Sequence, residues 1–136
     1  MTLIKDDGFH ADDLADVTFE TFEEGMVTPS YLDVENSINP TDLATHLDAK
    51  AIRIPFPSFA DGRGFSIARQ LRSMGYAGRL RAVGHLISDQ YLHARRAGFD
   101  EIEIDGAMAE RQPVEQWLAV SNWDKTTYQD RLRAST

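Results

Sequence analysis

The fold is decided by residues 52–66, which run Ile52-Arg53-Ile54-Pro55-Phe56-Pro57-Ser58-Phe59-Ala60-Asp61-Gly62-Arg63-Gly64-Phe65-Ser66. A strand-like apolar run is followed by an Asp and an Arg flanked by glycines, and then by an amphipathic helical pattern. In parallel α/β sheets, ligands bind where the carboxyl end of a strand meets its helix. The stretch therefore predicts a strand, a turn and a helix, and its turn is the first candidate for a functional site.

Strand and helix alternate along most of the remaining chain. The expected elements are a helix from Asn39 to about residue 47, strands over 51–56, 80–83 and 101–105, and helices over 66–74, 88–97 and 113–120. Pro55 and Pro57 should end the pairing of the first strand or confine that end to an edge. Two similar segments, 72–76 and 95–99, lie at corresponding corners and indicate successive βαβ units.

Capping residues mark the ends of these predicted helices. Ser66 and Ser88 occupy positions typical of N-caps, and Asn39 precedes Pro40 in the same way. Gly75 and Gly98 occupy the positions at which left-handed residues end helices. The helix boundaries follow from these residues.

The pattern as a whole predicts a single α/β domain on a small parallel sheet of successive βαβ units, either an open sheet or part of a barrel. Its βα repeats cover residues 39–120. Residues 1–38 are expected to be irregular, with one or two strands near Val17-Thr18-Phe19, and residues 121–136 form a polar tail. Because a short sheet leaves open edges that a second copy can cover, we expect a homo-oligomer.

Composition excludes several classes of function. The chain contains no cysteine, so disulfide, thiol and cysteine-ligated iron–sulfur chemistry are excluded within it. The net charge is −8, yet residues 51–100 carry eight arginines against three aspartates. An acidic protein with an arginine-rich middle favours a local anion site or a partner surface over nucleic acid. No apolar run is long enough to cross a bilayer and no signal-peptide pattern begins the chain, so no membrane contact and a cytoplasmic location are expected.

The candidate site lies at the predicted carboxyl edge of the parallel strands. Arg63 offers a bidentate fork for an oxyanion, and Gly62 and Gly64 would let the backbone approach it. Asp61 and His85 are candidate catalytic groups for proton transfer. The residues expected at the anion site are Asp61, Gly62, Arg63, Gly64, Ser66, Asp89 and Gln90.

Each candidate also has a structural interpretation. Asp61 can bond its own turn, and Arg63 can pair with Asp61 or Asp89. Asp89 and Gln90 fit a helix-capping role. The arginines of the two predicted helices form a solvated face or a partner surface; they are Arg69, Arg72, Arg95 and Arg96. The histidines have no metal-ligand spacing and no cofactor motif occurs, so neither metal nor cofactor is expected.

Several of these residues also belong to a pattern that is similar to a known protein family. The run 56–66, followed by Leu80-Arg81-Ala82-Val83-Gly84, Asp89-Gln90 and Gly98-Phe99-Asp100, resembles bacterial domain-of-unknown-function family 934. The resemblance covers about residues 50–105. Proteins of that family are linked to sulfite reduction because their genes accompany sulfite reductase, which implies sulfite reductase or another sulfur-assimilation enzyme as the partner.

Two positions depart from the family pattern. His85 stands where an acidic residue usually follows Gly84, and Ala97 stands where a cysteine often precedes the Gly-Phe pair. If that acid or thiol were catalytic, this chain would be altered in activity. The absent cysteine argues that thiol chemistry is dispensable here.

Two classes of function remain open from the sequence. The first is an accessory or binding protein of assimilatory sulfite reduction that docks through its arginine-rich helices. The second is a small enzyme that binds an oxyanion at the Asp61–Ser66 loop, with Asp61 or His85 moving a proton. A dimeric scaffold derived from a barrel fragment is a third possibility. The sequence does not decide whether the protein is an enzyme.

Overall fold

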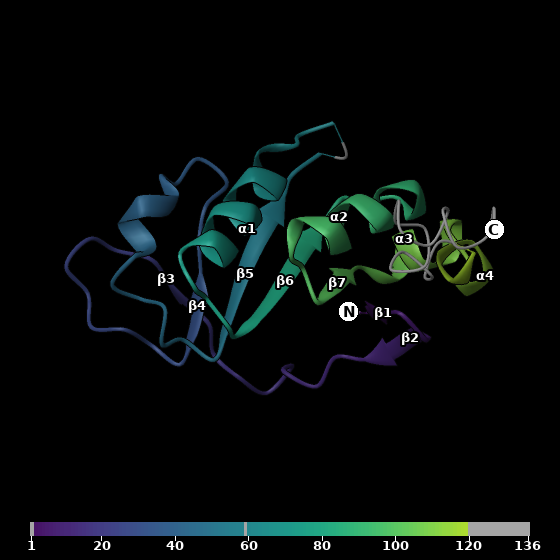
Figure 1. Cartoon of the computed structure of the whole chain (residues 1–136). Helices are drawn as coiled ribbons and strands as arrows, with labels where there is room; N and C mark the ends of the chain where they lie inside the picture. The colour runs from purple at the N-terminus through teal and green to yellow at the C-terminus, as the bar shows by residue number, and fades with distance from the viewer. Residues whose placement is uncertain (1, 59, 120–136) are drawn as a thin grey trace, which may run out of the picture.

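A mixed sheet of seven strands organises the computed structural model, which describes residues 2–58 and 60–119 (Figure 1). The strands stand in the order β2-β1-β7-β6-β5-β4-β3. Their bounds are β1 Thr2–Lys5, β2 Gly8–Ala11, β3 Glu20–Thr21, β4 Tyr31–Asp33, β5 Ala51–Phe56, β6 Arg79–Gly84 and β7 Glu101–Ile104. Strands β3 to β7 are parallel to one another, whereas β1 is antiparallel to both β7 and β2.

Two helices, α1 and α2, lie side by side on one face of the sheet (Figure 1). The helical segments are η1 Pro40–Leu43, α1 Arg63–Ser73, η2 Ser88–Gln90, α2 Tyr91–Ala97, α3 Gly106–Arg111 and α4 Val114–Leu118. Gly75 and Gly98 have φ of 99° and 117°, which confirms that left-handed glycines follow α1 and α2. No helix among the described residues has the length and apolar character that a membrane span requires.

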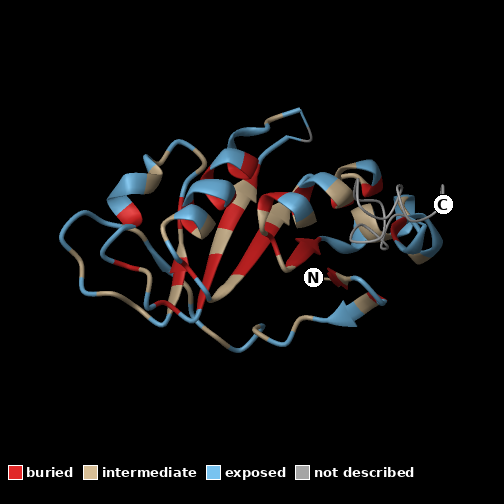
Figure 2. Cartoon of the chain, viewed as in Figure 1, coloured by how far each residue is buried: buried red, intermediate tan, exposed pale blue. Residues whose placement is uncertain are grey.

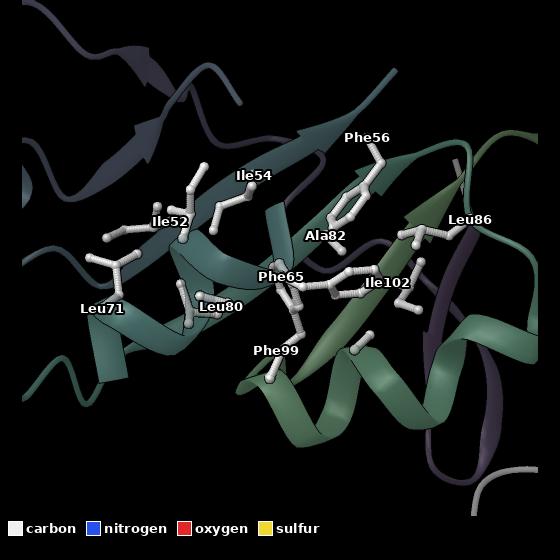
Figure 3. Packing of buried hydrophobic residues seen from close by; sticks show 14 of the residues in the cluster. Ile52, Ile54, Phe56, Phe65, Leu71, Leu80, Ala82, Leu86, Phe99 and Ile102 are labelled. Carbon is white, nitrogen blue, oxygen red and sulfur yellow. The ribbon is translucent and has the colours of Figure 1, made fainter. Parts of the chain in front are cut away.

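The hydrophobic core lies between this helical pair and the sheet. On β5, alternate residues Ile52, Ile54 and Phe56 are buried towards the helices, and register places Ile52 beside Leu80 on β6. Phe65, Leu71 and Phe99 meet them from the helix side (Figure 3); Figure 2 shows how burial concentrates on the central strands. The Phe56 and Phe65 ring centroids are 4.9 Å apart.

The opposite face of the sheet is charged rather than apolar. Register aligns Asp33, Arg53, Arg81 and Glu101 in one row across β4 to β7. Residues 12–19 cross this face between β2 and β3. Among them Asp12 bonds Arg81, and the Phe19 ring lies 3.8 Å from the Arg53 guanidinium carbon. The sheet is therefore covered by helices on one face and in part by a chain segment on the other.

Pro55 limits the pairing of β5 on one side, and β5 ends at Phe56, directly before Pro57. Pairing of β5 with β4 ends at Arg53, whereas pairing with β6 continues to Phe56. The Arg53 carbonyl accepts a hydrogen bond from Val34 N on the β4 side, and the Phe56 carbonyl accepts one from His85 N on the β6 side. Because the backbone groups of successive residues in a strand point to alternate sides, the nitrogen of Pro55 points towards β4. Pro55 therefore lacks an N–H only on the side where pairing with β4 has already ended, so no hydrogen bond of the sheet is lost.

The predicted small parallel sheet is corrected to a mixed one. The parallel pairing of strands 51–56, 79–84 and 101–104 is confirmed, but residues 2–33 contribute four strands where one or two were expected. β3 begins at Glu20, so the strand expected at 17–19 is wrong. β1 to β4 are two to four residues long, too short for alternation to reveal them.

Helix boundaries also differ from the prediction. Helix α1 begins at Arg63, so Ser66 lies inside it and is not its N-cap. The helix at 88 begins as the short turn η2 with Ile87 at the cap position, so Ser88 is not the cap. Asn39 does cap η1 through Thr41, but η1 is a single 3₁₀ turn. Helix α3 was not predicted, and α4 ends at Leu118. The predicted tail 121–136 lies outside the described residues.

Candidate functional site

The loop after β5 is held together by Asp61. Its Oδ1 accepts hydrogen bonds from the backbone N and the Nε of Arg63, both at 3.1 Å. Its Oδ2 accepts from Arg63 Nη2 at 2.8 Å and from Asn36 Nδ2, which follows β4, at 2.6 Å. Because Asp61 satisfies the backbone N of Arg63, α1 starts there, three residues earlier than expected.

This pairing sets the charge of the loop. Hydrogen bonds from Arg63, together with one from Asn36, lower the pKa of Asp61 to about 2, and the same pair raises the pKa of Arg63. Asp61 is therefore a carboxylate at neutral pH and a poor proton donor or acceptor. The arrangement supports the structural interpretation of Asp61. The Arg63 side chain nevertheless remains 62% exposed.

The two glycines beside Arg63 differ in their surroundings. A Cβ on Gly64 would stand 2.5 Å from Cζ of the buried Phe56 ring, so Gly64 lets α1 pack closely on β5. A Cβ on Gly62 would meet only Phe65, at 3.8 Å. Gly64 thus serves helix packing, and only Gly62 leaves the backbone open to solvent. Ser66 is exposed on the first turns of α1.

His85 follows the end of β6, and a close approach of β6 to β5 sets its position. Gly84 has a φ of 119°, and a Cβ there would stand 2.6 Å from the Phe56 carbonyl oxygen. That oxygen accepts from the His85 backbone N at 2.8 Å. The His85 side chain is exposed. Within the described chain no hydrogen bond or ion pair joins His85 to Asp61, whose partners are Arg63 and Asn36.

Instead, His85 lines a cavity of about 480 Å³ with residues of α3 and its flanks. His85 and Asp105 directly follow the neighbouring parallel strands β6 and β7, and both line this cavity. Sequence reasoning missed Met108, Arg111 and Gln112, because α3 has no buried residue and hence no apolar periodicity. The only signal for α3 was Asp105, whose Oδ1 accepts from Met108 N at 2.8 Å as an N-cap.

Asp89 and Gln90 lie in the short turn η2. Gln90 Oε1 accepts a hydrogen bond from Ile87 N at 3.0 Å, so Gln90 closes the turn that precedes α2. Asp89 is exposed in the same turn. The geometry favours the capping role that the sequence offered for this pair.

The four helix arginines divide into two pairs. Arg72 donates to the carbonyls of Gly78 (2.8 Å) and Gly98 (2.8 Å) and pairs with Asp100. Arg95 donates to the Phe99 carbonyl and pairs with Asp6. These two arginines join chain segments inside the molecule.

Arg69 and Arg96 are exposed on α1 and α2. Arg69 Nη2 lies 2.8 Å from Nε2 of His93, and the His93 ring stacks on Phe65 with centroids 4.0 Å apart. Burial and the neighbouring Arg69 lower the pKa of His93. Because Arg96 follows His93 by three residues on α2, these side chains form one continuous surface. We call Arg69, His93 and Arg96 the helical basic surface.

No group of three or more His, Asp or Glu side chains within 2–58 and 60–119 is arranged to hold a metal ion. The described residues also bring no nucleophile and base into contact at the sheet edge. The arrangement defines a small α/β protein with an exposed basic helical surface and a cavity at the carboxyl edge of its parallel strands.

The chain belongs to the family described as "Bacterial protein of unknown function (DUF934)", whose model matches residues 32–136. The match confirms the resemblance seen in the sequence. It begins inside β4 and includes β5 to β7 and α1 to α4, so β1 to β3 lie before it. No curated protein and no solved structure matches the chain.

Proposed function

We propose that the protein is a cytoplasmic accessory protein of assimilatory sulfite reduction, and that it docks on sulfite reductase or another sulfur-assimilation enzyme. The exposed pair Arg69 and Arg96 carries this proposal. Two exposed arginines on adjacent helices of a protein with net charge −8 form a local positive surface, which favours an acidic patch on a partner. The link to sulfite reduction comes from the family resemblance.

The state of the candidate catalytic residues also supports a binding role. Asp61 is engaged by Arg63 and Asn36, and His85 faces a different part of the edge. Arg72 and Arg95 are half-buried and bond backbone carbonyls and carboxylates inside the molecule, whereas Arg69 and Arg96 are exposed. We therefore assign the docking surface to the helical basic surface.

Co-purification with sulfite reductase tests this proposal. Arg69→Glu and Arg96→Glu should each lower recovery of the complex, because charge reversal at an interface changes association most where the charges meet the partner. Lys50→Glu, a reversal of another exposed cation that lies directly before β5 and on neither helix, is the matched control and should leave recovery unchanged. Full recovery with both arginine variants contradicts this surface, and no complex with the wild-type chain contradicts the partner.

The second candidate is a small enzyme that binds an oxyanion at the Asp61–Ser66 loop. The 62% exposure of Arg63 favours it, since an anion can reach the guanidinium without opening the core. An anion there would share Arg63 with Asp61. Asp61→Asn should therefore strengthen binding and Arg63→Ala should abolish it.

A thermal-shift titration with sulfite, sulfate, phosphate and adenylyl sulfate separates the two candidates. A ligand at a hundredfold its dissociation constant stabilises the folded protein by about 2.7 kcal/mol. A shift that disappears in Arg63→Ala favours the oxyanion site. If no anion shifts the wild type or Asp61→Asn, the loop has a structural role.

A further inference from the structure

We infer that the cavity beside α3 binds a small organic anion, a molecule with one oxyanion head group and an apolar body. The cavity lies at the carboxyl ends of β6 and β7, where α3 follows β7 (Figure 1). It uses none of the residues of the helical basic surface or of the Asp61–Ser66 loop. The inference is therefore independent of the proposed docking.

The cavity has the size and lining of a small-molecule site. Its volume of about 480 Å³ falls within the range of about 300–1,000 Å³ that such sites occupy. Ile87, Ala107 and Met108 give it a mostly apolar wall. A few polar groups converging on an apolar wall are typical of sites that orient one end of a ligand.

Gln112 connects the two walls of the cavity, which are the loop after β6 and the C-terminal end of α3. Its Oε1 accepts from Ser88 N at 2.6 Å, and its Nε2 donates to the Leu86 carbonyl at 3.2 Å. One amide thus fastens the loop after β6 to the residue that follows α3. Because both walls are fixed by these bonds, the cavity is formed before a ligand arrives, which lowers the entropic cost of binding.

Two side chains at the cavity are available for an anion. The side chains of Arg111 and His85 make no hydrogen bond or ion pair with any residue in the described ranges. Most other arginines of the described chain are engaged, as Arg53, Arg63, Arg72 and Arg79 show. A planar guanidinium that faces an apolar cavity without a carboxylate partner suits a carboxylate, sulfonate or phosphate head group.

Asp105 also lines the cavity, but it stands at the other end of α3. Its Oδ1 is engaged as the N-cap of the helix. Six residues separate Asp105 from Arg111, which at a rise of 1.5 Å per residue is about 9 Å along the helix axis. A head group bound at Arg111 therefore avoids the carboxylate, and the apolar body lies over Met108 between them.

An NMR titration of the ¹⁵N-labelled full chain tests the inference. The probes are benzoate, benzenesulfonate and phenyl phosphate, with benzyl alcohol as the uncharged control and inorganic sulfate as the control without an apolar body. We expect the three organic anions to shift the amides of Leu86, Ile87 and Gln112 in saturable fashion. Benzyl alcohol and sulfate should bind at least about tenfold more weakly, because each lacks one half of the required chemistry.

A substitution at Arg111 and a control substitution away from the cavity test where the anions bind. Arg111→Gln should weaken binding of all three anions by at least about tenfold, the lower end for a hydrogen bond to a charged group, and should leave benzyl alcohol unaffected. Lys50→Gln, which removes an exposed cation away from the cavity, should change nothing. The spectra themselves report whether each variant is folded.

Three results would overturn the inference: no saturable shift with any organic anion at millimolar concentration, equal affinity in Arg111→Gln and wild type, or shifts confined to residues outside the cavity. Shifts at Arg63 instead would favour the oxyanion loop, and they would leave the docking proposal untouched.

Discussion

Arg81 and Glu103 form an ion pair inside the molecule, on the face of the sheet opposite α1 and α2. Nη1 of Arg81 and Oε1 of Glu103 are 2.7 Å apart, and only 1% and 3% of the two side chains are exposed. Arg81 also meets Glu101 at 2.6 Å and Asp12 at 2.7 Å. Burial lowers the pKa of Arg81, but these carboxylates more than compensate and raise it overall, so the guanidinium stays charged.

Arg81→Met should therefore lower the free energy of unfolding by about 3 kcal/mol, because it leaves the buried carboxylate of Glu103 without its close cation, whereas Glu101 keeps Arg79. Urea denaturation followed by circular dichroism measures the change. Arg69→Met is the control, since Arg69 is exposed and its loss should cost less than about 1 kcal/mol. Equal costs for the two variants would show that the buried ion pair contributes nothing specific.

The Asp61–Arg63 pair should make the free energy of unfolding depend on pH in the acid range. The pKa of Asp61 is lowered from 3.8 to about 2 in the folded protein. A carboxyl with a lowered folded pKa contributes stability that is present above its unfolded pKa and is lost as pH falls through its folded pKa. The contribution of Asp61 should thus be complete above about pH 4 and disappear towards pH 2.

Carboxyl NMR titration checks this expectation directly. In Arg63→Gln the midpoint of Asp61 should move up towards 3.8, whereas in Arg69→Gln it should stay where it is. A midpoint that is the same in Arg63→Gln and wild type would mean that Arg63 is not the cause of the shift.

Gly62 and Gly64 should respond differently to the same substitution. Gly64→Ala drives a Cβ into the buried Phe56 ring and should cost about 1–3 kcal/mol. Gly62→Ala meets only Phe65 at 3.8 Å, so it should cost no more than about 1 kcal/mol at this cap position. Thermal unfolding of both variants measures the difference. A larger loss for Gly62→Ala would contradict the packing role assigned to Gly64.

The central strands could be predicted because apolar residues alternate with charged ones along much of each strand, and because each strand ends at a glycine, a proline or a polar turn. Strands β5, β6 and β7 were found within a residue or two for this reason. Strands β1 and β2 were not, because they lack the Glu-Ile alternation that marks β7, a strand of the same length, and no helical pattern lies beside them. Leu3 and Ile4 are buried because β1 pairs with β7, which is distant in the sequence, and the residues around β1 do not indicate that partner.

The site was harder to predict than the strands. The sequence placed Asp61 and Arg63 in one turn, but whether Arg63 faces a ligand or Asp61 depends on the loop conformation and on Asn36 beyond β4. The convergence of His85 with Arg111 depends on α3, a six-residue helix with no buried face. For Arg63 and for the pair His85 and Arg111, the fold and not the residue type determines which groups the side chains meet.

Arg72 offers a last prediction, because it joins two αβ corners that look alike in the sequence. Its guanidinium donates to the carbonyls of Gly98, Tyr76 and Gly78 and to the Asp100 carboxylate. Arg72→Met removes these charged donors and leaves half-buried acceptors, so it should lower the free energy of unfolding by about 1.5–3 kcal/mol. Arg96→Met, on the exposed side of α2, should change it by less than about 1 kcal/mol, the upper range for an exposed charged side chain. Hydrogen exchange should locate the Arg72 effect at residues 76–80 and 98–100. If Arg72→Met instead kept wild-type stability and lost sulfite reductase in co-purification, Arg72 would belong to the docking surface after all.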